Sequence, residues 1–88
     1  MNAKSDVIRL FKELTKEEDV NMNSRLYDYM DSLDSVEYII KAEQFFNVSI
    51  RDDEAEKINT PNDLLKIVYK YRPDLQITAK IKRILNKN

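Results

Sequence analysis

The first apolar pattern in the chain has a helical period. Its apolar residues lie at positions i, i+3, i+4 and i+7: Val7, Leu10, Phe11 and Leu14. This spacing places them on one face of an amphipathic α-helix. We therefore predict a helix over roughly residues 4–16, with Ser5 or Asp6 as its N-terminal cap.

Residues 17–31 show no such period. The stretch is polar and irregular, and Asn21 and Asn23 are typical of turns. Its candidate anchors to a core are Met22, Leu26, Tyr27 and Met30. A connection of about 15 residues is long for a compact domain, and loops of this length are often functional. We expect a long first loop that flanks a functional site.

A second helical pattern covers roughly residues 32–46. Its expected buried face consists of Val36, Ile39, Ile40 and Phe46, with Leu33 and Ala42 nearby. Asp31 is a good N-cap residue, and Asp34 adds negative charge to the first turn, where the helix dipole favours it. Ser32 would then be the first helical residue.

Two further helices are predicted in the second half of the bundle. After an extended crossing, a short helix should occupy residues 52–57. Thr60-Pro61-Asn62-Asp63 then has a cap, a proline at the first helical position and an acid in the first turn, which together mark a helix start. Pro73 should end this helix at about residue 71. Its apolar stripe is Leu64, Leu65, Ile67, Val68 and Tyr71.

Beyond Pro73 the pattern predicts a basic amphipathic helix. Its apolar stripe is Ile77, Ile81, Ile84 and Leu85, and its basic residues are Lys80, Lys82, Arg83 and Lys87. This extension, residues 73–88, either packs on the bundle or contacts an anionic membrane or a partner. Packing is favoured, because an isolated helix of about a dozen residues is marginal in water. The predicted fold class is all-α: a four-helix bundle over residues 1–72, with a long first loop, a short third helix and an extra C-terminal helix.

Composition excludes several kinds of site. The 88 residues include no cysteine, no histidine and no glycine. Disulfides, thiolate metal sites, histidine bases and glycine-rich phosphate loops are therefore excluded. These absences argue against a self-contained enzyme and leave a carrier or binding module.

The charge is unevenly distributed. Residues 1–71 hold 10 basic and 15 acidic residues, a net charge of −5, whereas residues 72–88 have a net charge of +4. The acidic body argues against nucleic-acid binding, in which phosphate contacts dominate affinity. No apolar run approaches the roughly 20 residues of a transmembrane helix, and we see no signal-peptide pattern. We therefore expect a cytoplasmic protein, and a monomer.

The run Asp31-Ser32-Leu33-Asp34-Ser35-Val36-Glu37 opens the second predicted helix. Three further segments follow it: Phe46 to Ile50, Asp53-Glu54-Ala55-Glu56-Lys57-Ile58, and Thr60. In this order and spacing the chain resembles the acyl carrier protein family over roughly residues 5–71. Asp-Ser-Leu alone recurs by chance, but the motif and the downstream segments together are specific. The resemblance implies a helical bundle of acyl-carrier type.

The resemblance also implies that Ser32 is the attachment point of 4′-phosphopantetheine. A phosphopantetheinyl transferase would move this group from coenzyme A, and its thiol would hold an acyl chain for acyl-transferring or acyl-modifying enzymes. Asp31 matches an aspartate that helps to position the transferase's metal and cofactor, and Leu33 matches an apolar contact for the arm or for partners. The implied function is that of a carrier and not of an enzyme, because the cofactor brings its own nucleophile.

Other positions of the second helix are candidates for partner binding. Asp34, Glu37 and Glu43 match acidic positions that the family presents to basic patches on enzymes, and Ile40 matches an apolar contact. Such charges mainly steer encounter. The alternatives are an ordinary solvated face for the acids and core packing for Ile40.

Two alternatives to an attachment site also exist. Ser32 could simply cap the helix, since Asp-Ser pairs often begin helices. The chain could also be an unmodified carrier-like interaction domain that docks through its acidic helix. The downstream segments favour the attachment site over plain capping, and the unmodified interaction domain stays as the alternative function.

Three positions depart from the family pattern. Tyr29 stands where glycine is common, and its ring could shield the arm or contact a dedicated partner. Ala42 replaces a larger aliphatic residue, and Lys41 places positive charge on the second helix. We therefore predict a specialised carrier in a lipid, secondary-metabolite or modification pathway.

Overall fold

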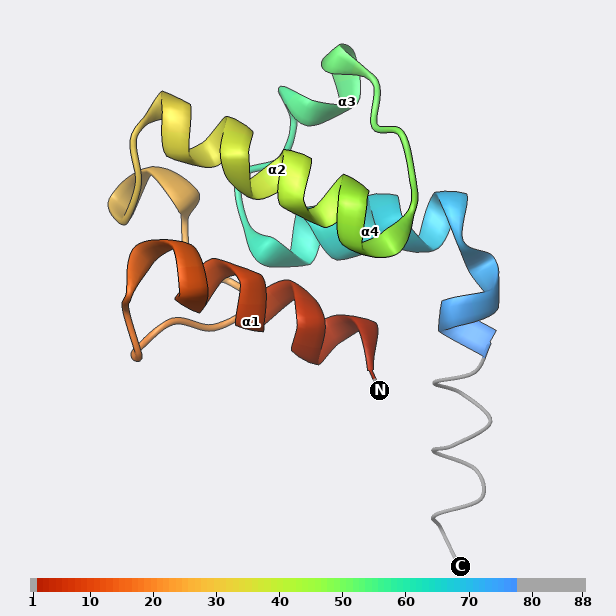
Figure 1. Cartoon of the computed structure of the whole chain (residues 1–88), viewed down its shortest axis with the longest axis horizontal. Coiled ribbons are helices and arrows are strands. Elements are labelled where there is room, and N and C mark those ends of the chain that lie inside the picture. Colours follow the sequence, from red (N-terminus) through yellow and green to blue (C-terminus); the bar gives the residue numbers. More distant parts are fainter. Residues whose placement is uncertain (1, 78–88) are drawn as a thin grey trace, which may run out of the picture.

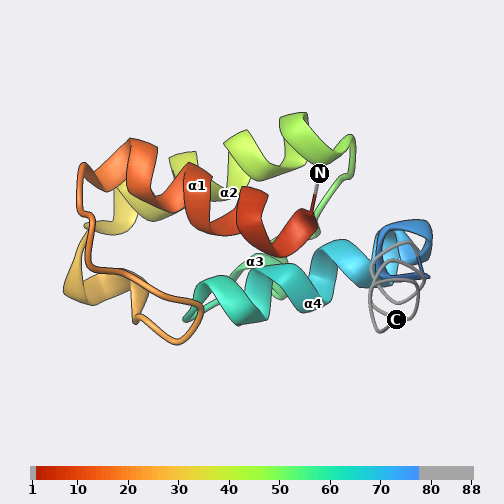
Figure 2. The same ribbon diagram turned by 90° about the horizontal axis from the view of Figure 1, so that it is seen from below.

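The computed structural model describes residues 2–77, in which the predicted all-α fold is confirmed. Its helices are α1 (Ala3–Thr15), the short 3₁₀ turn η1 (Leu26–Asp28), α2 (Ser32–Phe46), α3 (Asp52–Ala55) and α4 (Pro61–Tyr71). Residues 73–77 are also helical. The helices α1, α2 and α4 run alongside one another around a common core (Figures 1 and 2). η1 and the start of α2 lie at one end of the molecule, and residues 73–77 lie at the other (Figure 1).

The helix ends show how local chemistry sets the boundaries. Asn2, not Ser5 or Asp6, caps α1: the side-chain oxygen of Asn2 accepts a hydrogen bond from the Lys4 N–H at 2.8 Å. The predicted cap of α4 is confirmed, because the Thr60 hydroxyl accepts a hydrogen bond from the Asp63 N–H at 3.2 Å. The reciprocal bond from the Thr60 N–H to the Asp63 carboxylate completes a capping box.

Helix C-termini usually end on a left-handed residue, which is most often glycine. Since the chain lacks glycine, Lys16 (φ 61°) and Asn47 (φ 57°) take this conformation after α1 and α2. Asn47 adopts it readily, whereas a lysine does so at a cost of about 1–2 kcal/mol. Each N–H then bonds back to the preceding turn, Lys16 to the Lys12 carbonyl and Asn47 to the Glu43 carbonyl.

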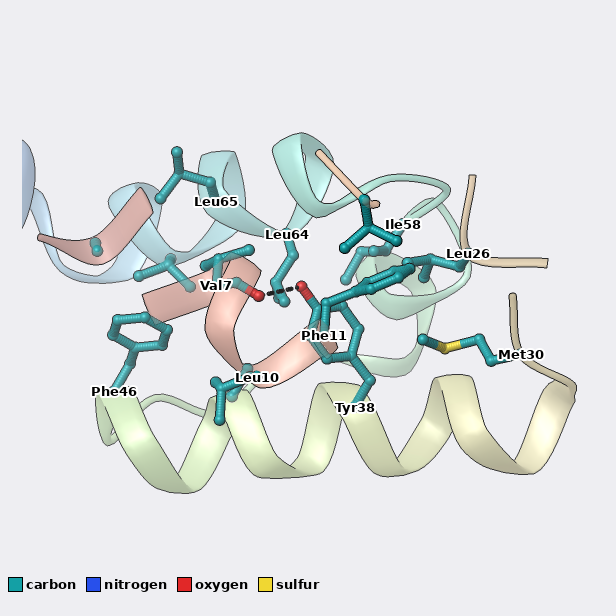
Figure 3. Close-up of a cluster of buried hydrophobic side chains, with 14 residues drawn as sticks. Val7, Leu10, Phe11, Leu26, Met30, Tyr38, Phe46, Ile58, Leu64 and Leu65 are labelled. Atoms are coloured by element: carbon teal, nitrogen blue, oxygen red, sulfur yellow. Dashed lines mark hydrogen bonds between the residues drawn. The ribbon is translucent and has the colours of Figure 1, made fainter. Parts of the chain in front are cut away.

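The core lies between α1, α2 and α4, and Tyr38 is at its centre (Figure 3). Tyr38 is fully buried, and its hydroxyl donates a hydrogen bond to the Val7 carbonyl at 2.8 Å. Its ring packs edge-to-face on Phe11, with the centroids 5.4 Å apart. The predicted α1 face is confirmed for Val7, Leu10 and Phe11, and Leu64, Leu65 and Val68 bury the facing side of α4.

The predicted buried face of α2 is confirmed only in part. Ala42 and Phe46 are buried and Ile39 packs partly buried against the core, whereas Leu33, Val36 and Ile40 are 80%, 53% and 45% exposed. Ser35 and Tyr38, which were not predicted, complete the buried face. Because α2 has apolar residues on two faces, the period alone does not choose between them. The aromatic ring of Tyr38 determines which face is buried, since a tyrosine buries a large apolar area once its hydroxyl has a hydrogen-bond partner.

Three of the four predicted anchors of the loop between α1 and α2 contact the core. Leu26 and Met30 are buried and Met22 packs partly buried against the core, whereas Tyr27 is 64% exposed. Val20, which was not predicted, is also buried in the core. The Leu26 N–H donates to the Asn59 carbonyl at 2.9 Å, and the Asn62 N–H donates to the Met22 carbonyl at 2.9 Å. The loop is therefore tied along its length to the segment that leads into α4.

The C-terminal boundaries follow proline. α4 ends at Tyr71, as predicted from Pro73, and Pro73 begins the helical residues 73–77. The rest of the predicted basic helix, including Ile81, Ile84 and its lysines, lies outside the described residues. Among residues 2–77, no helix has both the length and the apolar content to span a membrane.

Candidate functional site

Ser32 is the first residue of α2, and its side chain is exposed. The cap of α2 is Asp31, whose carboxylate accepts a hydrogen bond from the Asp34 N–H at 2.8 Å. The interpretation of Ser32 as the helix cap is therefore wrong. Within residues 2–77 the Ser32 hydroxyl has no hydrogen-bond partner. The hydroxyl is free to react.

The backbone around Ser32 is nevertheless held firmly. The Ser35 hydroxyl donates to the Ser32 carbonyl at 2.9 Å, and the Ser35 N–H donates to the Asp31 carbonyl at 3.0 Å. On the other side of the motif, buried Met30 donates its N–H to the Leu26 carbonyl at 2.9 Å. A fixed backbone with a free hydroxyl suits a residue that must be presented to another protein.

The residues present fit a phosphodiester on Ser32. The first N–H groups of a helix have no intrahelical partner, and the dipole of the 15-residue helix α2 is positive at this end. Since Asp31 occupies only the Asp34 N–H, the N–H groups of Ser32 and Leu33 remain to face an anion beside them. Ser32 and Leu33 are thus the residues that would hold the phosphate of 4′-phosphopantetheine.

An exposed apolar stripe continues from Ser32 along α2. At 100° per residue, Leu33, Val36, Glu37 and Ile40 share the face opposite the buried Tyr38 and Ala42. The alternative that Ile40 packs in the core is wrong, because its side chain is 45% exposed. Sequence reasoning placed Val36 in the core and so missed it as part of this face.

The predicted acidic positions do not all lie in the same environment. Glu37 is exposed and pairs loosely with Lys41 at 3.9 Å, and Asp34 is half-buried in the first turn. Glu43 is also half-buried, and its carboxylate accepts the Ile50 N–H at 2.8 Å. Glu43 therefore braces the segment that leaves α2.

The three departures from the family pattern have distinct surroundings. Tyr29 is 39% exposed, and its ring packs edge-on against Phe11 with 5.8 Å between centroids. Ala42 is fully buried. Lys41 is half-exposed beside Glu37.

A polar cluster that sequence reasoning missed fastens α3 to α4. Within residues 52–55, α3 buries no side chain. Instead the Glu54 carboxylate accepts hydrogen bonds from Lys70, at 2.7 Å, and from the Tyr71 hydroxyl. These two hydrogen bonds lower the pKa of Glu54 to about 2. Lys70 and Tyr71 lie 16 and 17 positions from Glu54 in the sequence, so no local pattern predicts this contact.

Residues 2–77 contain no group of three acidic side chains placed to hold a metal ion.

Comparison with known proteins identifies the family. The family model described as "Phosphopantetheine attachment site" matches residues 5–68. The chain is 53% identical to an acyl carrier protein of Thermosynechococcus vestitus over 38 residues, which cover 43% of this chain and 47% of that protein. It is 47% identical over 38 residues to an acyl carrier protein of Wolinella succinogenes, covering 43% and 50%. These alignments span about half the length of the curated relatives. The chain therefore belongs to the phosphopantetheine attachment site family, that of the acyl carrier proteins, whose prosthetic group is 4′-phosphopantetheine.

Proposed function

We propose that this protein is an acyl carrier, not an enzyme, and that Ser32 is its point of attachment for 4′-phosphopantetheine. The observation that carries the proposal is the exposed Ser32 hydroxyl at the first residue of α2, left free because Asp31 caps the helix. Ser32 also lies inside the segment that matches the family.

The chain itself contributes only the Ser32 hydroxyl to the loading reaction. During loading, Ser32 Oγ forms a bond to the pantetheine-bearing phosphorus of coenzyme A, the bond from that phosphorus to the bridging oxygen of the diphosphate breaks, adenosine 3′,5′-bisphosphate leaves, and the hydroxyl proton passes to a base of the transferase. When bound, the group supplies a thiol that holds an acyl chain as a thioester. A protein with neither cysteine nor histidine can do this work, because the transferase provides the base and the cofactor provides the thiol.

The exposed face of α2 is the proposed docking surface for acyl-transferring and acyl-modifying enzymes. Leu33 and Ile40 supply apolar contact, Val36 lies between them, and Glu37 and Asp34 supply negative charge. The charges would steer encounter with basic partners, and the apolar residues would supply affinity. Glu43 remains a predicted contact, although its carboxylate already has a structural partner.

The finer assignments remain proposals. Tyr29, Ala42 and Lys41 support a specialised lipid, secondary-metabolite or modification pathway, because they alter the loop, the core and the charge near Ser32. The net charge of −5 on residues 1–71 supports protein partners over nucleic acid. The cytoplasmic location and the monomeric state stay predictions.

Loading in solution tests the proposal. The purified chain is incubated with coenzyme A, Mg²⁺ and a broad-specificity phosphopantetheinyl transferase, and the intact mass is measured. We expect the chain to gain one phosphopantetheinyl group. Ser32→Ala should gain none, whereas Ser49→Ala, which alters another exposed serine, should be loaded like the parent.

An unchanged mass of the parent chain, or full loading of Ser32→Ala, would contradict the attachment site. If the chain is not loaded but still binds a carrier-type partner enzyme equally well with Ser32→Ala, the unmodified interaction domain becomes the better account.

A further inference from the structure

Most of the exposed large apolar side chains lie close to Ser32 in the sequence. Seven such side chains occur among the described residues, and five of them lie within residues 27–40: Tyr27, Tyr29, Leu33, Val36 and Ile40. The other two are Phe45, in the last turn of α2, and Ile77, which follows α4. Single exposed apolar residues are ordinary, but a cluster of them marks a contact surface.

Two members of this cluster come from outside α2. Tyr27 lies in η1 and Tyr29 follows it, so both precede Ser32 in the chain. Their neighbours Leu26 and Met30 are 0% and 6% exposed, and the Met30 N–H bonds to the Leu26 carbonyl at 2.9 Å. This closed turn buries its two ends and turns Tyr27 outward.

Neither tyrosine is explained by the fold alone. Tyr27 is 64% exposed and, within residues 2–77, makes no hydrogen bond or ring contact. Tyr29 rests one edge on Phe11, which fixes its ring while leaving 39% of the residue exposed. A partly exposed tyrosine binds a partner at a low cost in conformational entropy, because its side chain has only two χ angles.

The charges near the two tyrosines are mostly negative. Residues 25–41 include four carboxylates, those of Asp28, Asp31, Asp34 and Glu37, and two basic residues, Arg25 and Lys41, at the ends of the segment. Asp28, Asp31 and Glu37 are exposed. A partner that covers this surface must therefore present a basic rim around an apolar patch.

We propose that Tyr27 and Tyr29 form an aromatic ledge that the phosphopantetheinyl transferase contacts while it loads Ser32, and that this ledge sets how well a given transferase recognises the chain. The inference rests on the proposed function of Ser32. The transferase is the occupant because it must bring its reacting atoms to Ser32 Oγ itself, and so must cover the residues on both sides of Ser32. Acyl-handling enzymes reach their cargo through the arm and have no such requirement.

The test is loading kinetics with coenzyme A, Mg²⁺ and a purified broad-specificity transferase, using the full chain. Tyr27→Ala should raise KM about tenfold and change kcat by less than about twofold, as expected for a lost interface contact. Tyr27→Phe should keep most of the parent kcat/KM, since the ring supplies most of the contact area. Tyr29→Leu, which retains an apolar contact to Phe11, should give a smaller rise in KM. Phe45→Ala is the matched control at the far end of α2, and its KM should equal that of the parent.

Thermal melting of each variant shows that the fold is retained, which is expected for Tyr27 because its side chain is exposed. Parent-like KM in Tyr27→Ala would overturn the ledge while leaving Ser32 as the attachment site. An equal rise of KM in Phe45→Ala would also overturn it, since the effect would not be local. Absence of loading in the parent chain would overturn the proposed function and this inference with it.

Discussion

The hydrogen bond from Tyr38 to the Val7 carbonyl is the contact whose removal tests the described core most cleanly. Tyr38→Phe deletes the hydroxyl and keeps the ring, so the edge-to-face contact with Phe11 at 5.4 Å should survive. The Val7 carbonyl is not orphaned, because it remains the acceptor for a backbone N–H within α1. The loss should therefore be that of one net buried hydrogen bond, about 1 kcal/mol.

In a domain of this size, 1 kcal/mol corresponds to a fall in Tm of about 4–8 °C. Thermal and urea unfolding followed by circular dichroism measure both quantities. Tyr27→Phe is the control, because it removes the same atom from an exposed ring without a partner and should change stability by less than about 0.5 kcal/mol. Equal stability of the two variants would refute the described packing of Tyr38.

The same variant has a pH signature. Burial raises the pKa of the Tyr38 phenol above that of an unfolded tyrosine, about 10. The contribution of the neutral phenol to stability is thus complete below about pH 10 and is lost as the pH rises beyond it. Between pH 8 and pH 11 the parent should lose more stability than Tyr38→Phe. Parallel pH profiles would contradict the burial of this group.

Three further predictions concern the polar contacts and the core. The pKa of Glu54 is lowered to about 2, so its contribution to stability is present above about pH 4.5 and is lost as the pH falls toward 2. Glu54→Gln should abolish this part of the acid sensitivity, as measured by urea unfolding at a series of pH values from 2 to 7. Ala42→Leu should overpack the fully buried site and lower the free energy of unfolding by about 1–3 kcal/mol, measured by urea denaturation. Asp31→Asn should keep the helix cap and leave the Tm unchanged, but it should slow the loading of Ser32 if the transferase uses the carboxylate. Loading at the parent's rate would show that Asp31 acts only as the helix cap.

Much of the chain was predictable because its local signals agree with one another. The start of α2 was predicted from Asp31, whose side chain caps the helix as expected, whereas the left-handed Asn47 that ends the helix was predicted to belong to an extended segment. The start of α4 follows from Thr60 and Pro61, whose conformations are both suited to a helix start. Ser32 was found as a candidate through the resemblance of residues 31–37 and the segments that follow them to the acyl carrier protein family; its place as the first helical residue follows from the cap that precedes it.

The features that were missed depend on contacts between segments distant in the sequence. The buried face of α2 depends on Tyr38, whose hydroxyl finds its acceptor 31 residues away on Val7. The exposure of Val36 follows from the same choice of face. The attachment of α3 to α4 depends on the hydrogen bonds of Glu54 with Lys70 and Tyr71, which the apolar periodicity of neither segment predicts.

The proposed function requires that Ser32 carries a phosphopantetheine arm in the cell. The most direct measurement is mass spectrometry of the chain purified from its own host, with fragmentation of the peptide that contains Ser32. Our account predicts a phosphopantetheinyl group on Ser32, bearing an acyl chain in part of the population, whose mass would identify the cargo. A Ser32 peptide that is wholly unmodified in growing cells would contradict it.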